Sequence, residues 1–439
     1  MNSISESIAG LSPPVSLLRR HRDFRRLWAG ETVSIFGSRM GDVAVSFAAI
    51  IAIGATPAQM GVLASVRLIP KMLLSLIAGV WVDRLRRRPL MIGADLGRFA
   101  LLATIPIAAM IGHLRMNLFY LVILSVSVLD LLFDLAYGAY LPSLIDSADL
   151  VEANSKLSAS YAAAEVGGFA LAGWLVQILT APHAILVDAV SFIASALAIN
   201  SIRRVERPIT QGRNRRNFYR EALEGVRVVI NDRRLSVLAL VNGLAAFSYA
   251  IFSTLYMLFV VRTLGFAPGV LGMIFAIGGV SSFFSSLVAP RFVARSSEGC
   301  ALACGLALQG ISWFCVPAAR GATVAAATLL IVQQLFGDAS GTVAIITGST
   351  VLQILVPGQM LGRVKATISL ISTATLIAGS LAAGWAAELV GLRPVIYVAA
   401  IGLTAAGGLL MLSPVRAVNA NDAPIAAGDS IAADISLPQ

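Results

Sequence analysis

Several apolar stretches of this sequence contain isolated charged side chains. The basic ones are Arg39, Arg67 and Lys71, and the acidic ones are Asp42, Asp130, Asp134, Glu165, Asp188 and Asp338. A charged group in an apolar environment is costly, so each of these residues is a candidate for function. A carboxylate in a partly hydrated cavity could load and release a proton, and a nearby arginine could instead hold it in a fixed ion pair.

The spacing of these carboxylates favours different roles. Asp130 lies about 13 residues into its apolar stretch, which is near the middle of a membrane, so we favour it for proton coupling or for binding a cationic substrate. Asp134 is one helical turn further on. It could pass the proton onward or have a structural role. Asp42 could exchange a proton, or it could form a fixed pair with Arg67.

A short loop between two apolar stretches is strongly basic. Residues 79–89 read Gly-Val-Trp-Val-Asp-Arg-Leu-Arg-Arg-Arg-Pro and place four arginines within five positions. Such a cluster does not readily cross a membrane, so we expect the loop on the cytoplasmic side.

The composition is that of a membrane protein. Of the 439 residues, 57% are hydrophobic and 13% are charged, and the charged fraction is about half of that in a soluble protein. The net charge of +10 would suggest a nucleic-acid partner in a soluble protein. Here the basic residues flank apolar stretches, so we expect membrane lipids and no nucleic acid. No cleavable signal peptide is visible.

The chain lacks the patterns of a metal site or of a nucleotide-driven pump. Its three cysteines fall in or beside one apolar stretch, and its three histidines are scattered near segment ends. No Gly-x-x-x-x-Gly-Lys-Ser/Thr motif is present. We therefore expect no metal, no cofactor and no enzymatic activity.

Apolar stretches long enough to cross a bilayer, about 20 residues each, occur in two groups of six. They cover residues 27–54, 58–82, 88–111, 117–140, 157–180 and 183–201, and then 235–262, 268–290, 299–318, 323–348, 363–388 and 392–413. This pattern predicts an all-α integral membrane fold with twelve spanning helices in two halves, residues 19–201 and 235–413. The tails, residues 1–18 and 414–439, are expected to be disordered.

The distribution of basic residues predicts the orientation. With the amino terminus inside, 25 of the 33 Lys and Arg residues fall in cytoplasmic segments and four in outer loops, so both termini are expected in the cytoplasm. Ten of the 25 lie in the linker, residues 202–234, which contains an amphipathic stretch at 218–230. This linker could lie along the inner leaflet, or it could be a solvated spacer.

Several segments together resemble a known family. Residues 79–89 fit the pattern Gly-x-x-x-Asp-Arg-x-x-Arg-Arg. The other segments are residues 21–28 with Gly37, Gly41 and Asp42; residues 67–70; residues 94–98; residues 134–145 with Leu150, Ala153 and Asn154; and residues 356–364. This ordered set resembles the major facilitator superfamily (MFS). Within it, the chain is most similar to the bacterial exporters called transmembrane secretion effectors, which include macrolide-efflux and siderophore-export proteins.

The resemblance implies two roles. In this superfamily two halves rock about a central cavity, lined by helices 1, 4, 7 and 10, so Asp42, Asp130, Asp134 and Asp338 could face it. The basic loop is implied to be a conformational latch, in which the carboxylate meets the amino end of helix 11 and is held by arginines. The latch residues are Gly79, Asp83, Arg84, Arg87 and Arg88.

The sequence also departs from the family. Arg86 stands where a glycine often follows the Asp-Arg pair, Phe169 takes a proline-like place in the fifth helix, and the fourth helix lacks the arginine of many proton-driven exporters. Proton coupling is therefore implied by the branch and not by a motif.

The expected function is secondary active export, by proton antiport, of a drug-like or siderophore-like small molecule. The expected protein is a monomer in the bacterial inner membrane. An importer of a small metabolite, or a membrane receptor or scaffold that transports nothing, are the alternatives.

Overall fold

The computed structural model describes residues 16–82, 85–203, 218–293, 296–419 and 422, and these residues are almost entirely α-helical. The amino-terminal half begins with the short helix α1 (Leu17–Arg20). Its long helices are α2 (Arg22–Phe47) continued by the π-helical turn η1 (Ala48–Ile53), α3 (Pro57–Val82), α4 (Arg87–Met110), α5 (Met116–Leu144), α6 (Leu150–Leu179) and α7 (Ala181–Asn200). A 3-10 turn, η2 (Ser147–Asp149), precedes α6.

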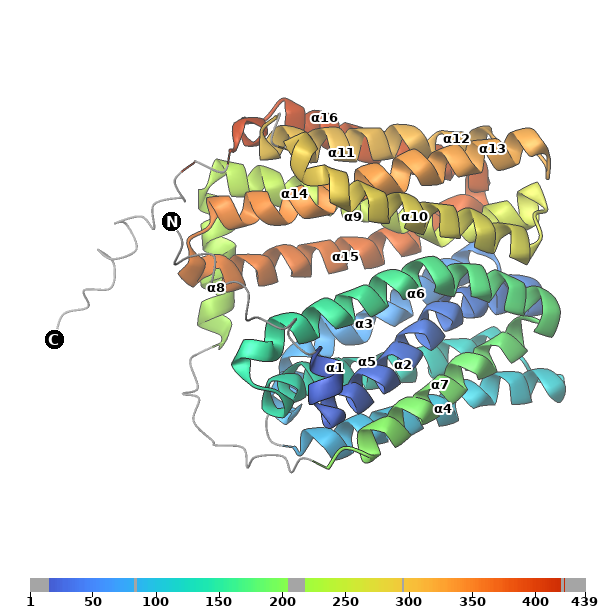
Figure 1. Cartoon of the computed structure of the whole chain (residues 1–439). Coiled ribbons are helices and arrows are strands. Elements are labelled where there is room, and N and C mark those ends of the chain that lie inside the picture. Colours follow the sequence, from blue (N-terminus) through green and yellow to red (C-terminus); the bar gives the residue numbers. More distant parts are fainter. Residues whose placement is uncertain (1–15, 83–84, 204–217, 294–295, 420–421, 423–439) are drawn as a thin grey trace, which may run out of the picture.

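The second half follows the linker helix α8 (Phe218–Asn231) and repeats this plan. It contains α9 (Arg233–Leu258) with η3 (Phe259–Leu264), α10 (Pro268–Val293), α11 (Glu298–Trp313) with α12 (Cys315–Ala318), α13 (Val324–Gln333) with η4 (Gln334–Asp338) and α14 (Ala339–Leu355), α15 (Gly358–Val390), α16 (Leu392–Met411) and η5 (Pro414–Ala417). Figure 1 shows the halves as two stacked layers, with α8 across one end of the bundle.

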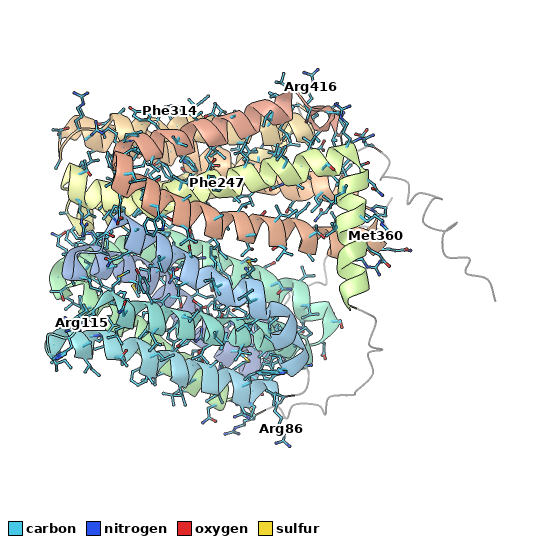
Figure 2. The ribbon with its side chains drawn as sticks, turned by 180° about the vertical axis from the view of Figure 1, so that it is seen from behind. Arg86, Arg115, Phe247, Phe314, Met360 and Arg416 are labelled. Carbon is cyan, nitrogen blue, oxygen red and sulfur yellow. The ribbon has the colours of Figure 1, made fainter. Side chains whose placement is uncertain are left out.

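The predicted fold class is confirmed. Among the described residues, eleven helical segments are long and apolar enough to cross a membrane, and α3, with 26 residues, lies between the first and second of them. The chain is an all-α integral membrane protein with twelve spanning helices in two halves of six. Figure 2 shows Arg86, Met360 and Arg416 toward one end of the bundle and Arg115 toward the other.

Two helices begin earlier than the apolar pattern predicts. We expected the fifth span to start at residue 157, but α6 starts at Leu150. Its first turns carry polar side chains, including an ion pair of 3.4 Å between Lys156 Nζ and Glu152 Oε1. Such i,i+4 pairs stabilise a helix outside the apolar region, where hydropathy gives no signal. The eleventh span likewise begins at Gly358 and not at residue 363.

The same turn follows the first spanning helix of each half. Gly54 and Gly265 have φ of 75° and 81° and end the π-helical turns η1 and η3. Glycine adopts this left-handed conformation without a steric cost. Pro57 and Pro268 then occupy the first position of α3 and α10, where a missing N–H group costs nothing. We call this end of the bundle the Gly54 end.

Small residues bring the two halves together near the Gly54 end. A Cβ atom added to Gly384 on α15 would lie 2.6 Å from the Pro57 carbonyl oxygen on α3, and one on Gly173 of α6 would lie 2.4 Å from the Pro268 carbonyl oxygen on α10. Hydrogen bonds run alongside, from Ala58 N to Glu388 Oε1 (3.2 Å) and from Gly269 N to Gln177 Oε1 (2.9 Å). Close backbone approach at small residues is typical of packed membrane helices.

Parts of the predicted tails and linker pack on the bundle. Leu17 in α1 is fully buried and donates its backbone N–H to Glu152 Oε1 (2.9 Å), and Val415 in η5 is also fully buried. Helix α8 packs on α15 through an ion pair of 2.6 Å between Arg363 and Glu224. The remainder of the tails and residues 204–217 lie outside the described residues.

Candidate functional site

A charged cavity of about 490 Å³ lies within the amino-terminal half. Helices α2, α3, α4 and α5 contribute its charged lining, and Tyr161 of α6 is also part of its wall. The charged residues are Glu31, Arg39, Asp42, Arg67, Lys71, Arg98, Asp130 and Asp134. Sequence positions more than a hundred residues apart are therefore brought to one cavity. They include Arg39, Arg67 and three of the four carboxylates that we expected to face a shared cavity, Asp42, Asp130 and Asp134.

Asp42 is at the centre of one group of ion pairs. Its Oδ1 accepts a hydrogen bond of 2.5 Å from Arg67, and its Oδ2 lies 3.9 Å from Arg39. The Nε of Arg39 in turn lies 3.2 Å from Glu165 Oε2 on α6. The Asp42–Arg67 pair, which we gave as one of two alternatives, is thus formed. Together with Arg39 and Glu165 it makes a group of four side chains that links α2, α3 and α6.

Asp130 is also paired, with a residue to which the sequence reasoning assigned no role. Its Oδ1 accepts a hydrogen bond of 2.9 Å from Arg98 on α4. Arg98 binds Asp95 on its other side, and its guanidinium lies 4.4 Å and 4.1 Å from the ring centres of Phe133 and Phe192. A planar guanidinium stacks well between two such rings. Arg98 therefore connects a half-exposed carboxylate in the cavity to a fully buried one.

Two further acidic side chains lie deep in this half. Glu31 on α2 and Asp188 on α7 are 7% and 5% exposed, and each has one carboxylate oxygen without a hydrogen-bond partner among the described residues. Asp188 fits closely against α2, because a Cβ atom on Gly41 would lie 1.9 Å from its Oδ2. Asp134 lies in the cavity wall, exposed, and no described basic group is within 4.0 Å of it.

The carboxyl-terminal half contains a cavity of similar size but different chemistry. It measures about 470 Å³, and helices α9, α11, α14, α15 and α16 form its wall. The lining is mostly Leu, Ile, Val, Ala and Gly, with Asn242, Tyr249 and Gln309 among the polar members and no charged side chain. Such a wall suits an uncharged or apolar molecular surface.

Asp338, the fourth carboxylate that we expected to face a shared cavity, is not part of the lining of either one. It ends the π-helical turn η4, and a Cβ atom on Gly278 of α10 would lie 2.1 Å from its Oδ2. Ser282 and Thr342 donate hydrogen bonds to its backbone carbonyl (3.3 and 2.8 Å). The π-helical turn is thus fixed against α10, and such turns are frequent at functional sites.

The aromatic residues of α9 have two different environments. Phe252 stacks on Trp313 with ring centres 4.0 Å apart, and Tyr256 is also buried. Tyr249, in contrast, is 52% exposed and lines the apolar cavity. Packing on Trp313 explains Phe252, and of these three residues Tyr249 is the one that lines the apolar cavity.

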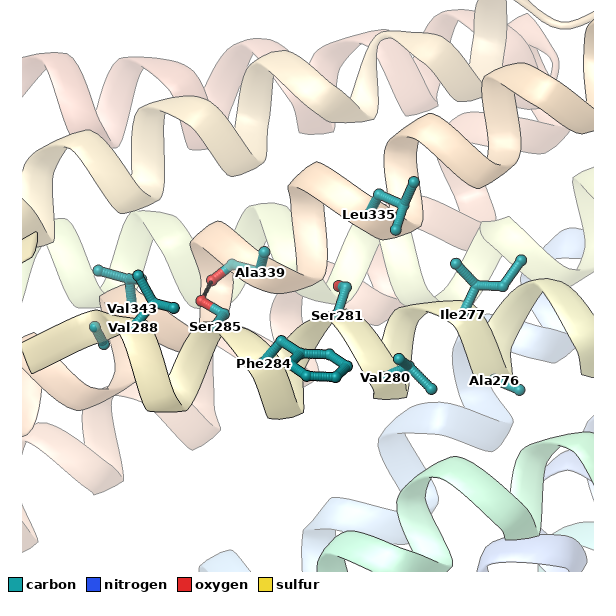
Figure 3. A pocket seen from close by; sticks show the side chains of 11 residues that line it. Ala276, Ile277, Val280, Ser281, Phe284, Ser285, Val288, Leu335, Ala339 and Val343 are labelled. Atoms are coloured by element: carbon teal, nitrogen blue, oxygen red, sulfur yellow. Dashed lines mark hydrogen bonds between the residues drawn. The ribbon is translucent and has the colours of Figure 1, made fainter.

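A larger hollow, of about 660 Å³, is lined by α10 on one side and by Leu335 and the start of α14 on the other (Figure 3). Its lining is apolar apart from Ser281 and Ser285, and the Ser285 hydroxyl donates to the Ala339 carbonyl at 2.7 Å. Because both serine hydroxyls already bind backbone carbonyls, this groove offers a ligand no charge and little polarity. We do not assign the functional site to it.

The latch residues are described only in part. Gly79 lies in the last turn of α3, and Asp83 and Arg84 lie outside the described residues. Arg87 donates to the Ala139 carbonyl (2.9 Å), and Arg88 donates to the Asn200 carbonyl (2.6 Å). Both arginines thus bind carbonyls in the last two turns of helices in their own half.

Comparison with known proteins decides the family. The profile of the transmembrane secretion effector family matches residues 12–434, which is nearly the whole chain. The chain belongs to this family. The predicted resemblance is therefore confirmed, and the protein is an MFS-type membrane transporter and not an enzyme.

Other similarities agree with that assignment. The MFS-type transporter y4rN of Sinorhizobium fredii (strain NBRC 101917 / NGR234) is 25% identical over 183 residues, which are 41% of this chain and 44% of that protein. The nucleoside transporter NupG (TM-score 0.74, 13% identity, 89% of this chain and 98% of that chain) is similar in structure. So is a bacterial homologue of the iron transporter ferroportin (TM-score 0.73, 18% identity, 90% and 99%). At such identities the two structures establish the fold alone.

The sequence contained a signal for the part of the site that was missed. Asp95 and Arg98 are three residues apart, so their side chains lie on one face of a helix, and both fall in an apolar stretch. In this secretion effector they form an ion pair that also engages Asp130. The i,i+3 spacing could have indicated the first pair, whereas the second depends on how α4 packs on α5.

Proposed function

We propose that this transporter is a proton-driven exporter that moves a drug-like or siderophore-like small molecule by alternating access. The observation that carries the proposal is the charged cavity, in which the half-exposed carboxylates of Asp42 and Asp130 each bind an arginine. A proton on either carboxylate would weaken its charge-assisted bond to the arginine. Proton binding would thereby change the contacts among α2, α3, α4 and α5.

The contacts between the halves indicate which end of the transporter must open during the conformational change. Close contacts at Gly384 and Gly173 lie toward the Gly54 end. By the distribution of basic residues this end faces outward, with both termini in the cytoplasm of a bacterial inner-membrane protein. Alkaline phosphatase is active only outside the cytoplasm, so a carboxyl-terminal fusion should be inactive. An active fusion would contradict the proposed orientation.

The basic loop is proposed as the cytoplasmic latch of this cycle. Arg87 and Arg88 anchor its α4 side to α5 and α7, which leaves the role of Asp83 to be tested directly. Asp83→Asn should impair transport at a normal level of membrane-inserted protein. Normal transport by this variant would remove the latch role.

The decisive experiment measures whether protons move opposite to the substrate or with it. Everted membrane vesicles are acidified inside by respiration and monitored with a fluorescent pH-gradient dye while candidate substrates are added outside. The candidates are ethidium, Hoechst 33342, a macrolide and a catechol siderophore. An exporter that exchanges protons releases protons from the vesicle, so the quenched fluorescence recovers, and an uncoupler abolishes the response.

The alternatives give different results in the same assay. A proton-coupled importer would be recognised by proton movement in the same direction as the substrate. A receptor or scaffold would show no transport of any candidate into vesicles, with or without the gradient. Vesicles without the protein, and vesicles with Asp146→Asn, an exposed position outside both cavities, serve as controls.

A further inference from the structure

Asp338 is a carboxylate without a matching positive charge. It lies midway along the span formed by α13, η4 and α14, where an unpaired charge is expensive. No Lys, Arg or His among the described residues lies within 4.0 Å of it. The charge that acts on it is a like charge, the carboxylate of Glu165 in the other half.

Two adjacent glycines on α10 place Asp338 and the backbone next to Glu165 at the same level along this helix. Gly278 faces the Asp338 carboxylate, and a Cβ atom on Gly279 would lie 2.9 Å from a methyl group of Val166. Val166 is the neighbour of Glu165 on α6. The two carboxylates therefore lie at the same level along α10, one from each half of the transporter. Arg39 partly neutralises Glu165, from 3.2 Å, so Asp338 is the less compensated of the two.

A chain of aromatic rings lies next to these carboxylates and crosses between the halves. Phe275, one turn before Gly278 on α10, has its ring centre 5.5 Å from Phe169 on α6 and 5.5 Å from Tyr256 on α9. The Tyr256 side chain is only 4% exposed, and its hydroxyl has no partner among the described residues. The charge of Asp338 acts on both Tyr256 and Tyr249. Aromatic faces and phenol oxygens both attract cations.

The interior of the spanning helices is acidic as a whole. It contains four basic residues, Arg39, Arg67, Lys71 and Arg98, and twice as many carboxylates. The carboxylates are Glu31, Asp42, Asp95, Asp130, Asp134, Glu165, Asp188 and Asp338. All three arginines are already bound to carboxylates. The pathway thus has little positive charge with which to attract an anion.

We propose that Asp338 and Glu165, with Tyr249, Tyr256 and Phe275, bind the positively charged group of an amphipathic organic cation. The uncharged part of the molecule would then lie against the apolar cavity of the carboxyl-terminal half. The inference rests on the proposed function and narrows it, because it favours amine-bearing, drug-like molecules over anionic, siderophore-like ones. It makes the contact with Asp338 the one that selects cationic over anionic substrates.

Two ions of the same shape and opposite charge test this proposal. Purified transporter in nanodiscs is titrated with radiolabelled tetraphenylphosphonium and, separately, with tetraphenylborate, and specific binding is defined by displacement with the unlabelled ion. The cation should bind at least about tenfold more tightly. Asp338→Asn should weaken cation binding by about tenfold or more, Asp338→Glu should retain most of it, and Asp146→Asn should change nothing.

Each other outcome contradicts the inference. Equal affinities, or tighter binding of the borate, would exclude a cation-selective site. Cation binding that is unchanged in a monodisperse Asp338→Asn protein would remove Asp338 from it. Because this assay needs no gradient, its result is independent of transport. Cation binding without proton-coupled efflux would overturn the proposed export function but not the proposed cation site. Proton-coupled efflux of anions would overturn the cation site but not the export function.

Discussion

The two halves of this transporter share a scaffold but differ in their cavities. Each half repeats the turn at Gly54 or Gly265, the proline that follows it, and the close contact between small residues across the interface. The cavities have nearly the same volume, about 490 and 470 Å³. One is lined by eight charged side chains and the other by none.

This difference suggests a division of labour. Repeated scaffold contacts are what a rocking motion between two halves requires. In the amino-terminal half, a carboxylate can either bind a proton or form an ion pair with an arginine. In the other half, the apolar wall can hold the uncharged part of a substrate. The predictions below test this asymmetry, beginning with the largest expected effect.

Removal of an arginine from the charged cavity should have the largest effect. Arg67→Met leaves Asp42 without its 2.5 Å partner, and we expect gradient-driven efflux to fall by about 100-fold, the upper range of such couplings. Gln309→Leu, in the wall of the apolar cavity, should cost less than about threefold. Efflux is measured in everted vesicles at equal protein level.

The double variant Asp42→Arg with Arg67→Asp restores a pair of reversed polarity and should recover part of the activity. If the Gln309 variant is as defective as the Arg67 variant, the two cavities do not divide the work as proposed.

The glycine contacts should instead behave alike in both halves. Gly173→Val and Gly384→Val each place a side-chain carbon closer to a backbone carbonyl oxygen than van der Waals contact allows. Overpacking of this kind costs about 1–3 kcal/mol. We expect similar falls in melting temperature and in transport for both variants. Gly408→Ala, which has nothing within 4 Å of the added carbon, is the matched control. A defect at only one of the two glycines would show that the interface is not symmetric.

A smaller and unequal effect is expected from the two side chains that bind helix amino ends across the interface. Glu388 and Gln177 accept hydrogen bonds from Ala58 N and Gly269 N, and loss of such a cap costs about 1 kcal/mol. Glu388→Ala should therefore separate the halves at the Gly54 end about fivefold more often. Gln177→Ala should do so less, because its amide is neutral.

Spin labels at Met110 and Leu389 would measure this separation, since both positions are exposed and belong to different halves. Glu388→Gln, which keeps an acceptor oxygen, should lie between wild type and Glu388→Ala. An unchanged distance distribution in all three variants would show that these bonds do not hold the end closed.

Much of the fold could be predicted from the sequence, because a bilayer requires long apolar stretches and basic residues mark their ends. The start of α6 at Leu150 could not, since its first turns are polar and are stabilised by local ion pairs. For the site, the Asp42–Arg67 pair was among the alternatives, whereas the Asp130–Arg98 pair was not. That pair depends on the packing of α4 against α5, which no periodicity within one helix specifies.

Asp338 illustrates a further limit. From the sequence, Asp338 could face a shared cavity with Asp42 and Asp130. In the structure it lies against Gly278 and is not part of the lining of either cavity. Unlike Asp42 and Asp130, it has no Lys, Arg or His within 4.0 Å among the described residues. Partners of this kind are set by tertiary contacts and not by sequence spacing.

The central claim, that the charged cavity couples protons to export, is tested most directly at Asp130. In proteoliposomes, Asp130→Asn should abolish uphill efflux driven by a pH gradient, because the carboxylate bound to Arg98 can no longer exchange a proton. The same variant should retain part of its downhill exchange of a neutral substrate, which needs no proton. Uphill efflux by Asp130→Asn with an unchanged pH profile would contradict the account and would leave Asp42 as the next residue to test.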